Sequence, residues 1–150
     1  MSDPRITSFS HIYLPVNNVD ESIDFYTQNL GFRLLRKYRM SADGNPSAYV
    51  ELGDVLLELT QSRTPLPRSS EGIESRIGLT VTDMDGVWAD LMKKGVEVSR
   101  EPFDARTFWG RQAQIKDPSG YGISLREWAA PDNPKFDGWQ PRHEGAERLA

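Results

Sequence analysis

Few side chains in this sequence can move a proton or bind a metal ion. Its 150 residues include two histidines, His11 and His143, and no cysteine. The lack of cysteine excludes disulfides, thiol catalysis and zinc sites built on thiolates. An imidazole or a carboxylate suits general acid–base catalysis as well as first-row metal ions. His11 opens the first strand-like segment, whereas His143 lies in the C-terminal tail.

A second group of polar side chains falls at alternating positions of strand-like segments. Because successive side chains of a strand point to opposite faces, one face is expected to carry Tyr13, Arg76, Thr80, Gln112, Gln114, Ser124 and Arg126. Arg76 and Arg126 form a positive pole in a chain whose net charge is -4. Such a pole suits a carboxylate, phosphate or enolate of a small ligand. The alternative is that each arginine pairs with an acidic neighbour and satisfies a polar interior.

The elements that position these side chains occur twice. HIYLPVNNVDESIDFYTQNLGFRLL, from His11, aligns with RIGLTVTDMDGVWADLMKKGVEVS, from Arg76, with one residue of slack before the glycine of each. Each begins with an alternating strand and continues as a segment with helical periodicity, a polar cap and a glycine stop. Strand signals follow at residues 32–40, 47–52 and 55–61, and again at 96–100, 111–116 and 122–127. The order predicts two βαβββ modules.

The predicted modules occupy most of the chain. We expect the first at residues 1–63 and the second at 75–128, with a linker rich in proline and serine at 64–74. Residues 129–150 form an extended C-terminal arm, expected to lie on the chain's own body or on a partner subunit. Its anchors would be Phe136 and Trp139.

Composition narrows the class of protein. Hydrophobic residues make up 37% and charged residues 27%, which indicates a globular chain rather than a disordered one. The negative net charge argues against a nucleic-acid partner. The sequence shows no apolar signal core at its start and no segment long enough to span a bilayer. We therefore expect a cytoplasmic protein with neither a membrane nor a nucleic-acid partner.

Four segments together resemble the vicinal oxygen chelate superfamily, which includes glyoxalase I, extradiol dioxygenases, fosfomycin-resistance transferases and bleomycin-binding proteins. They are the strand that opens at His11, DESIDFYTQNLGF from Asp20, LLELT from Leu56 and DPSGYGISL from Asp117. The resemblance covers residues 7–128. It implies an α+β fold of two tandem βαβββ modules that form a cup-shaped mixed sheet with helices on the outer face. It does not settle the function, since the superfamily carries many chemistries on one scaffold.

The resemblance also implies where metal ligands would lie, because the first and last strands of each module provide one ligand apiece in that family. These positions hold His11 and Glu58 in the first module, and Arg76 and Ser124 in the second. A guanidinium has no lone pair to donate, and a neutral hydroxyl is a poor replacement for a carboxylate. Two ligands fall short of the three that tight binding usually needs. The resemblance thus implies a degraded metal site.

Two interpretations of His11 and Glu58 stay open. Either they bind a divalent metal (Zn, Ni, Fe or Mn), or they form a hydrogen-bonded pair that lines the cup without metal, with Arg76 paired to Glu58 across it. Glu51, on a neighbouring strand, and His143, in the tail, could each reach the site, but neither occupies a ligand position of the family. Glu127 follows Ser124 by three positions, so strand alternation turns it to the other face.

Two aromatic residues in a predicted loop, Phe108 and Trp109, are further ligand-binding candidates. They precede Gly110 and a late strand. Exposed on such a loop, they would stack on a flat ligand. The alternative is that they pack as ordinary core.

Two classes of function follow. The first is a glyoxalase-like lyase, isomerase or dioxygenase, in which His11 or Glu58 moves a proton and a metal or Arg76 stabilises an enolate. The second is a binding module similar to antibiotic-sequestering resistance proteins, holding an anionic or aromatic ligand. Residues alone do not separate metal-free catalysis from sequestration. The family resemblance also implies a homodimer.

Overall fold

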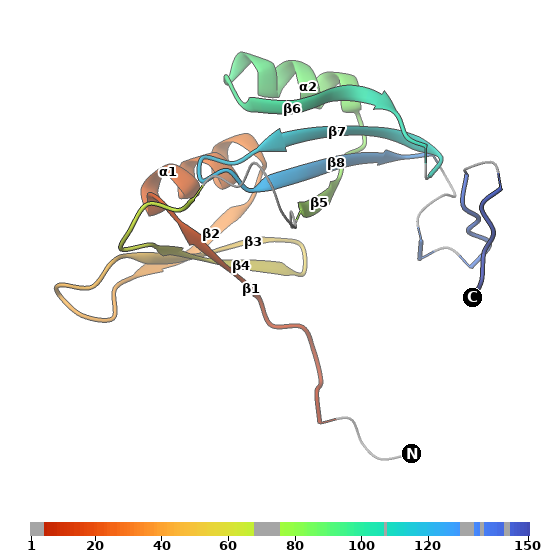
Figure 1. The fold of residues 1–150 in the computed structure, drawn as a ribbon. Helices are drawn as coiled ribbons and strands as arrows, with labels where there is room; N and C mark the ends of the chain where they lie inside the picture. The colour runs from red at the N-terminus through yellow and green to blue at the C-terminus, as the bar shows by residue number, and fades with distance from the viewer. Residues whose placement is uncertain (1–4, 68–75, 107, 130–133, 136, 143–144) are drawn as a thin grey trace. The chain divides into compact units, whose positions relative to one another are not determined.

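The computed structural model describes residues 5–67, 76–106, 108–129, 134–135, 137–142 and 145–150 (Figure 1). The chain divides into two compact units, Met1–Arg68 and Ser69–Ala150. The boundary falls within residues 64–74, where the sequence predicts a linker, and positions 68–74 of that range lie outside the described residues. In the part of the chain that is described, no helix has the length and apolar character needed to cross a membrane.

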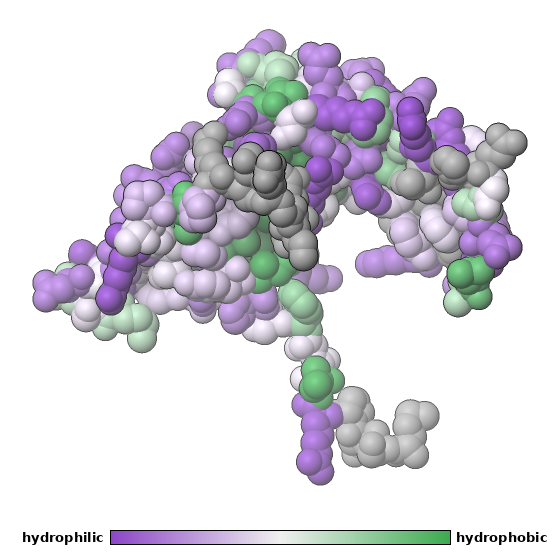
Figure 2. Space-filling model, in the orientation of Figure 1, coloured by the Kyte–Doolittle hydropathy of each residue, from purple (hydrophilic) through white to green (hydrophobic). Residues whose placement is uncertain are grey.

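The first unit is a βαβββ module. Its elements are β1 (Ile12–Val16), α1 (Val19–Asp24), a π-helical segment (Phe25–Asn29), β2 (Arg33–Tyr38), β3 (Ser47–Leu52) and β4 (Val55–Gln61). The four strands form one mixed sheet in the order β1-β4-β3-β2, in which β1 runs parallel to β4 and the other pairs are antiparallel. Ahead of β1, the chain from Arg5 leads away from the sheet as an exposed arm (Figures 1 and 2).

The two faces of the first sheet differ because each strand alternates apolar and polar residues. The core face carries fully buried side chains from β1, β3 and β4, namely Val16, Val50, Leu57 and Leu59, and α1 adds the fully buried Val19. The opposite face carries Tyr13, Tyr49 and Glu58, which are adjacent in the register of β1, β4 and β3. We call this second surface the open face of the first sheet.

The second unit repeats the same topology. It contains β5 (Arg76–Thr80), α2 (Met84–Lys93), β6 (Glu97–Asp104), β7 (Gly110–Lys116) and β8 (Gly122–Trp128). The strand order is β5-β8-β7-β6, again with the first and last strands parallel. Two βαβββ modules of α+β class are therefore confirmed. Of the six strands predicted after the two helices, five begin and end within two residues of the observed bounds. β6 is the exception, since it runs on to Asp104.

Matching registers make the two modules comparable residue by residue. Tyr13 lies opposite Glu58 in the β1–β4 pair, and Gly78 lies opposite Ser124 in the β5–β8 pair. Ser124 thus occupies in the second module the position that Glu58 occupies in the first. By the same register Arg76 corresponds to His11, which lies directly before β1. The second module therefore has a guanidinium and a hydroxyl where the first has an imidazole and a carboxylate.

The first repeat has one residue more than the second before its glycine, and the π-helical segment contains this extra residue. Gly31 follows Val19 by twelve positions, whereas Gly95 follows Met84 by eleven. Both glycines end their helix with positive φ, 79° and 71°, a conformation that glycine adopts without steric cost. A π-helical turn holds one residue more than an α-helical turn. The insertion therefore widens one turn and leaves the strands that follow in register.

Each helix is tied to the end of the last strand of its own module. The side-chain oxygen of Gln61 accepts from the backbone N–H of Val19 at 3.1 Å. At the equivalent place, the carboxylate of Glu127 accepts from the N–H of Met84 at 2.6 Å. Both N–H groups belong to the first helical turn, where no intrahelical acceptor exists. Glu127 thus lies on the helix side of its sheet, in agreement with strand alternation.

Candidate functional site

The carboxylate of Glu58 lies at the centre of the open face of the first sheet. Its side chain is 17% exposed. The oxygen Oε2 accepts a hydrogen bond from the phenol of Tyr49 and lies 3.5 Å from the phenol oxygen of Tyr38. The same oxygen lies 3.9 Å from Nε2 of His11. Side chains from β2, from β3 and from the residue directly before β1 thus converge on one carboxylate oxygen.

The imidazole of His11 is held between a hydroxyl and this carboxylate. Nδ1 lies 2.8 Å from Oγ of Ser10, and Nε2 faces Glu58. The ring also meets the ring of Tyr49 edge to face, with centroids 6.1 Å apart. The structure therefore brings together the two residues of the first module, His11 and Glu58, that the sequence singled out for catalysis or metal binding.

Two tyrosines complete this cluster, and sequence reasoning missed both. The rings of Tyr38 and Tyr49 are stacked, with centroids 5.6 Å apart and planes 19° from parallel. The hydrogen bond to Glu58, followed by the one to Tyr38, raises the pKa of the Tyr49 phenol, because loss of its proton would place a second negative charge beside the carboxylate. Strand alternation alone could have placed Tyr49 on this face. Its position opposite Glu58 depends on the β3–β4 register.

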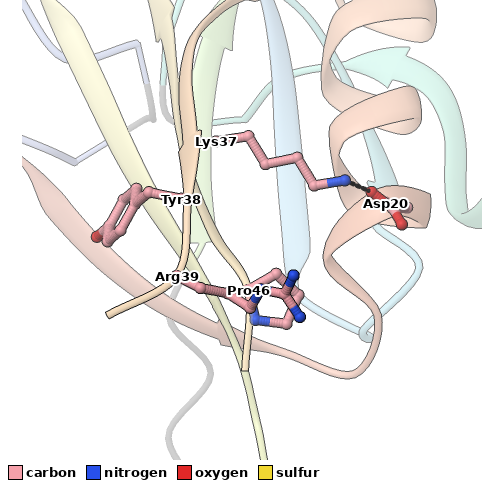
Figure 3. A pocket seen from close by; sticks show the side chains of 5 residues that line it. All are labelled: Asp20, Lys37, Tyr38, Arg39 and Pro46. Atoms are coloured by element: carbon pink, nitrogen blue, oxygen red, sulfur yellow. Dashed lines mark hydrogen bonds and ion pairs between the residues drawn. The ribbon is translucent and has the colours of Figure 1, made fainter. Parts of the chain in front are cut away.

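Two hollows border the first sheet. An apolar one of about 230 Å³ is lined by Leu35, Arg36, Tyr49 and Leu56. Another, of about 480 Å³, lies at the β2–β3 end and is lined by Asp20, Lys37, Tyr38, Arg39 and Pro46. Figure 3 shows that Lys37 reaches Asp20 of α1, whereas Tyr38 points to the other side of the strand. The ring of Tyr13 is 54% exposed on the open face.

The face of the second sheet that carries Ser124 and Arg126, which we call its open face, has a different chemistry. It holds a hollow of about 270 Å³ lined by Arg76, Gly78, Leu79, Thr80, Gln112, Ser124, Arg126 and Trp128. Among the lining residues that the structure describes, there are two guanidiniums and no carboxylate. We call this hollow the arginine pocket. The sequence analysis grouped six side chains of the second module on this face, and the arginine pocket contains five of them: Arg76, Thr80, Gln112, Ser124 and Arg126. The sixth, Gln114, lies next to Ser124 in the β7–β8 ladder.

Neighbouring residues fix the polar side chains of the arginine pocket. An added Cβ at Gly122 would come within 3.2 Å of Cγ of Arg76, so the arginine side chain runs directly over this glycine. Ser124 is buried, and its Oγ accepts from the amide of Gln112 at 2.9 Å. The absence of a side chain at Gly122 thus leaves the path along which Arg76 lies.

Aromatic rings support the second guanidinium. The guanidinium carbon of Arg126 lies 4.8 Å from the ring centroid of Phe108 and 5.4 Å from that of Trp128. The two rings pack against each other at 4.6 Å, and Phe108 is 2% exposed. The indole N–H of Trp128 donates to Oγ1 of Thr80 at 3.3 Å. Phe108 therefore contacts Arg126 as a packed ring and is not presented to solvent.

Trp109 has a different environment from its neighbour. It is 50% exposed, and the guanidinium of Arg142 lies 4.6 Å from its ring centroid. Arg142 also donates to the carbonyl oxygen of Ala105 at 2.9 Å. This part of the C-terminal arm therefore packs on the chain's own second unit. Of the predicted anchors, Trp139 is half-buried, whereas Phe136 lies outside the described residues.

Candidate metal ligands do not cluster among the described residues. In the ranges that the structure describes, no three or more histidine, aspartate or glutamate side chains form a group that could hold a metal ion. Glu51 is bound by the guanidinium of Arg33, and Glu127 by the start of α2. His143 lies outside the described residues. Together, His11 and Glu58 offer two ligands, and the oxygen of Glu58 that faces His11 already accepts from Tyr49.

Comparison with known proteins decides the family. Residues 8–125 match the model of the Glyoxalase/Bleomycin resistance protein/Dioxygenase superfamily. The chain belongs to this superfamily. The resemblance to the vicinal oxygen chelate group is thereby confirmed.

Relatives in this superfamily have different described roles. A probable lactoylglutathione lyase of Vibrio cholerae is 32% identical, over 83% of this chain and 91% of that protein. Lactoylglutathione lyase GLX1 of Arabidopsis thaliana is 29% identical, and the match spans 43% of its length. Among solved structures, TnmS3, an antibiotic-binding protein from Streptomyces, is 30% identical with a TM-score of 0.62 over 82% of this chain and 99% of that one. The trypanothione-dependent glyoxalase I of Leishmania major is 28% identical, with a TM-score of 0.65 over 78% and 84%.

Proposed function

We propose that this glyoxalase-superfamily protein binds a small, flat anion in the arginine pocket, without the help of a metal ion. The carrying observation is the composition of that pocket, since its described lining residues are two arginines and residues with neutral side chains. Guanidinium groups bind carboxylates and phosphates through paired, charge-assisted hydrogen bonds. An anionic ligand would pair with the guanidiniums of the pocket lining.

The neighbours of the two arginines support specific recognition rather than general attraction. Arg126 is oriented by the packed rings of Phe108 and Trp128, so it loses little side-chain entropy on binding. Gln112 and Ser124 place an amide and a hydroxyl beside the guanidiniums. Trp128 adds an indole to the pocket lining, and aromatic side chains suit a planar ligand.

Among the relatives, the Streptomyces antibiotic-binding protein supports a binding role, since it is 30% identical over 82% of this chain. The similarity to lactoylglutathione lyases favours a second candidate, an enzyme that acts on lactoylglutathione, with a divalent metal at His11 and Glu58. The two candidates differ in what they require. The first needs Arg76 and Arg126, whereas the second needs His11, Glu58 and metal.

Calorimetric titration with benzoate and with benzamide tests the binding proposal, because the two differ in charge but hardly in shape. We expect metal-free protein to bind benzoate and to bind benzamide at least about tenfold more weakly, since charge-assisted hydrogen bonds are the stronger kind. Arg126→Gln and Arg76→Gln should each weaken benzoate by about tenfold or more. Arg100→Gln is the matched control, because Arg100 lies on β6 of the same unit, over Phe103.

Equal affinity for benzoate and benzamide, or benzoate binding that survives both arginine substitutions, would contradict the proposal. Turnover of lactoylglutathione that requires added metal and is lost in Glu58→Gln would favour the enzyme instead. Both assays use the full chain, so their results can be compared directly.

A further inference from the structure

We infer that the phenols of Tyr49 and Tyr38 take the place of a metal ion as the partner of Glu58, and that Tyr49 suppresses metal binding at this position. This inference concerns the first unit alone. It goes beyond the proposed anion site, because it assigns a role to two tyrosines on the other sheet.

The first step concerns which carboxylate oxygen is engaged. A metal ion shared by His11 and Glu58 would lie about 2.0–2.2 Å from Nε2 and from a carboxylate oxygen. The oxygen that faces Nε2, at 3.9 Å, is Oε2. Oε2 is also the oxygen that accepts from Tyr49 and that lies near the phenol of Tyr38. A cation at this position would have to compete with a phenol for the same oxygen.

The second step concerns how firmly the phenol is held. Tyr49 lies directly opposite Glu58 in the β3–β4 ladder, so the backbone register brings the two side chains together. The ring of Tyr38, from β2, stacks on the ring of Tyr49. The rings of His11 and Tyr49 also meet in a T-shaped arrangement. The phenol therefore meets the carboxylate as part of a packed aromatic group, without the entropy cost of ordering a mobile side chain.

The third step concerns the strength of the competition. A hydrogen bond to an ionised group typically contributes about 1.5–3 kcal/mol, which corresponds to roughly tenfold or more in an equilibrium constant. Removing the Tyr49 hydroxyl should therefore raise the affinity of the His11–Glu58 pair for a divalent cation by at least about tenfold. Removing the Tyr38 hydroxyl should have a smaller effect, because its oxygen lies 3.5 Å away.

The experiment is a titration of the full chain, freed of metal by chelator and dialysis, with zinc chloride and with nickel chloride. Tyr49→Phe is compared with wild type and with Tyr13→Phe, the matched control. Tyr13 lies next to Glu58 on the neighbouring strand, but its ring is exposed. We expect Tyr49→Phe alone to gain about tenfold or more in affinity. The gain should vanish in the double variant Tyr49→Phe, Glu58→Gln, which locates the bound ion.

Circular dichroism checks that each variant is folded, and Tyr38→Phe gives a second series with a smaller gain. Unchanged metal affinity in a folded Tyr49→Phe protein would overturn the inference. So would tight binding by wild type that weakens in Tyr49→Phe, since Tyr49 would then orient Glu58 as a ligand. A benzoate titration of Tyr49→Phe separates this result from the proposed function, because the arginine pocket contains neither tyrosine.

Discussion

Replacing Gly110 by alanine should destabilise the second unit strongly. Gly110 begins β7 with φ of 148°, a conformation that residues with a side chain rarely adopt. An added Cβ would come within 2.1 Å of the carbonyl oxygen of Glu127 and 3.1 Å of the N–H nitrogen of Ala129. Both are backbone atoms, and the Ala129 N–H is hydrogen-bonded to the carbonyl of Trp109 at 2.8 Å. No side-chain rotation can therefore relieve the clash.

The size of the effect follows from two contributions. Overpacking a close-packed site costs about 1–3 kcal/mol, and a disfavoured backbone conformation costs about 1–3 kcal/mol more. We expect the free energy of unfolding to fall by about 2–6 kcal/mol. In a chain of this size that lowers the melting temperature by roughly 4–24 °C.

Thermal and urea unfolding, followed by circular dichroism, measure the effect. Gly78→Ala is the control, because an added Cβ at Gly78 has no described atom within 4 Å and its φ is not positive. That substitution should change stability by less than about 1 kcal/mol. If Gly110→Ala unfolds at the same midpoint as Gly78→Ala, the reasoning from backbone contacts is refuted.

Three further predictions concern interactions elsewhere in the two units. The pKa of Tyr49 is raised in the folded state. Its contribution to stability is therefore complete below the unfolded phenol's pKa of about 10 and is lost as the pH rises above that value. Urea unfolding from pH 9 to 11 should show a steeper loss of stability for wild type than for Tyr49→Phe. Gln61→Ala and Glu127→Ala should each lower the free energy of unfolding by about 0.5–2 kcal/mol in urea titrations, because each leaves a helix N–H without its acceptor. Deleting residues 129–150 removes the contacts of Arg142 and should lower the melting temperature. Light scattering on the intact chain tests the predicted homodimer, and a monomer at micromolar concentration would contradict it.

The elements of the fold could be predicted because their signals are local. Alternation marks β1 and β5, and a polar cap and a glycine delimit each helix, as Asn18 and Gly31 do in the first. The face that carries Arg76, Ser124 and Arg126 follows from the same alternation. These features depend on neighbours along the chain, so a single sequence contains them.

The partners of the site residues could not be predicted because they depend on pairing between distant segments. Tyr49 meets Glu58 through the β3–β4 register, which the sequence does not state. Phe108 lies in a segment with the composition of an exposed loop, yet its ring is buried against Trp128. Likewise, the slack in the repeat was visible, but the π-helical turn that absorbs it was not.

The hydrogen bonds that Gln61 and Glu127 accept from the first turns of the two helices have a consequence for the order of folding. In each module the first strand pairs with the last, and the last strand also binds the start of the helix. Neither the first strand nor the helix therefore has its full set of partners until the last strand of the module has been synthesised, and such long-range pairing is slow to form. The first module has all of its strands by Gln61, before any of the second is made. Folding during translation would thus proceed in two steps, one module at a time.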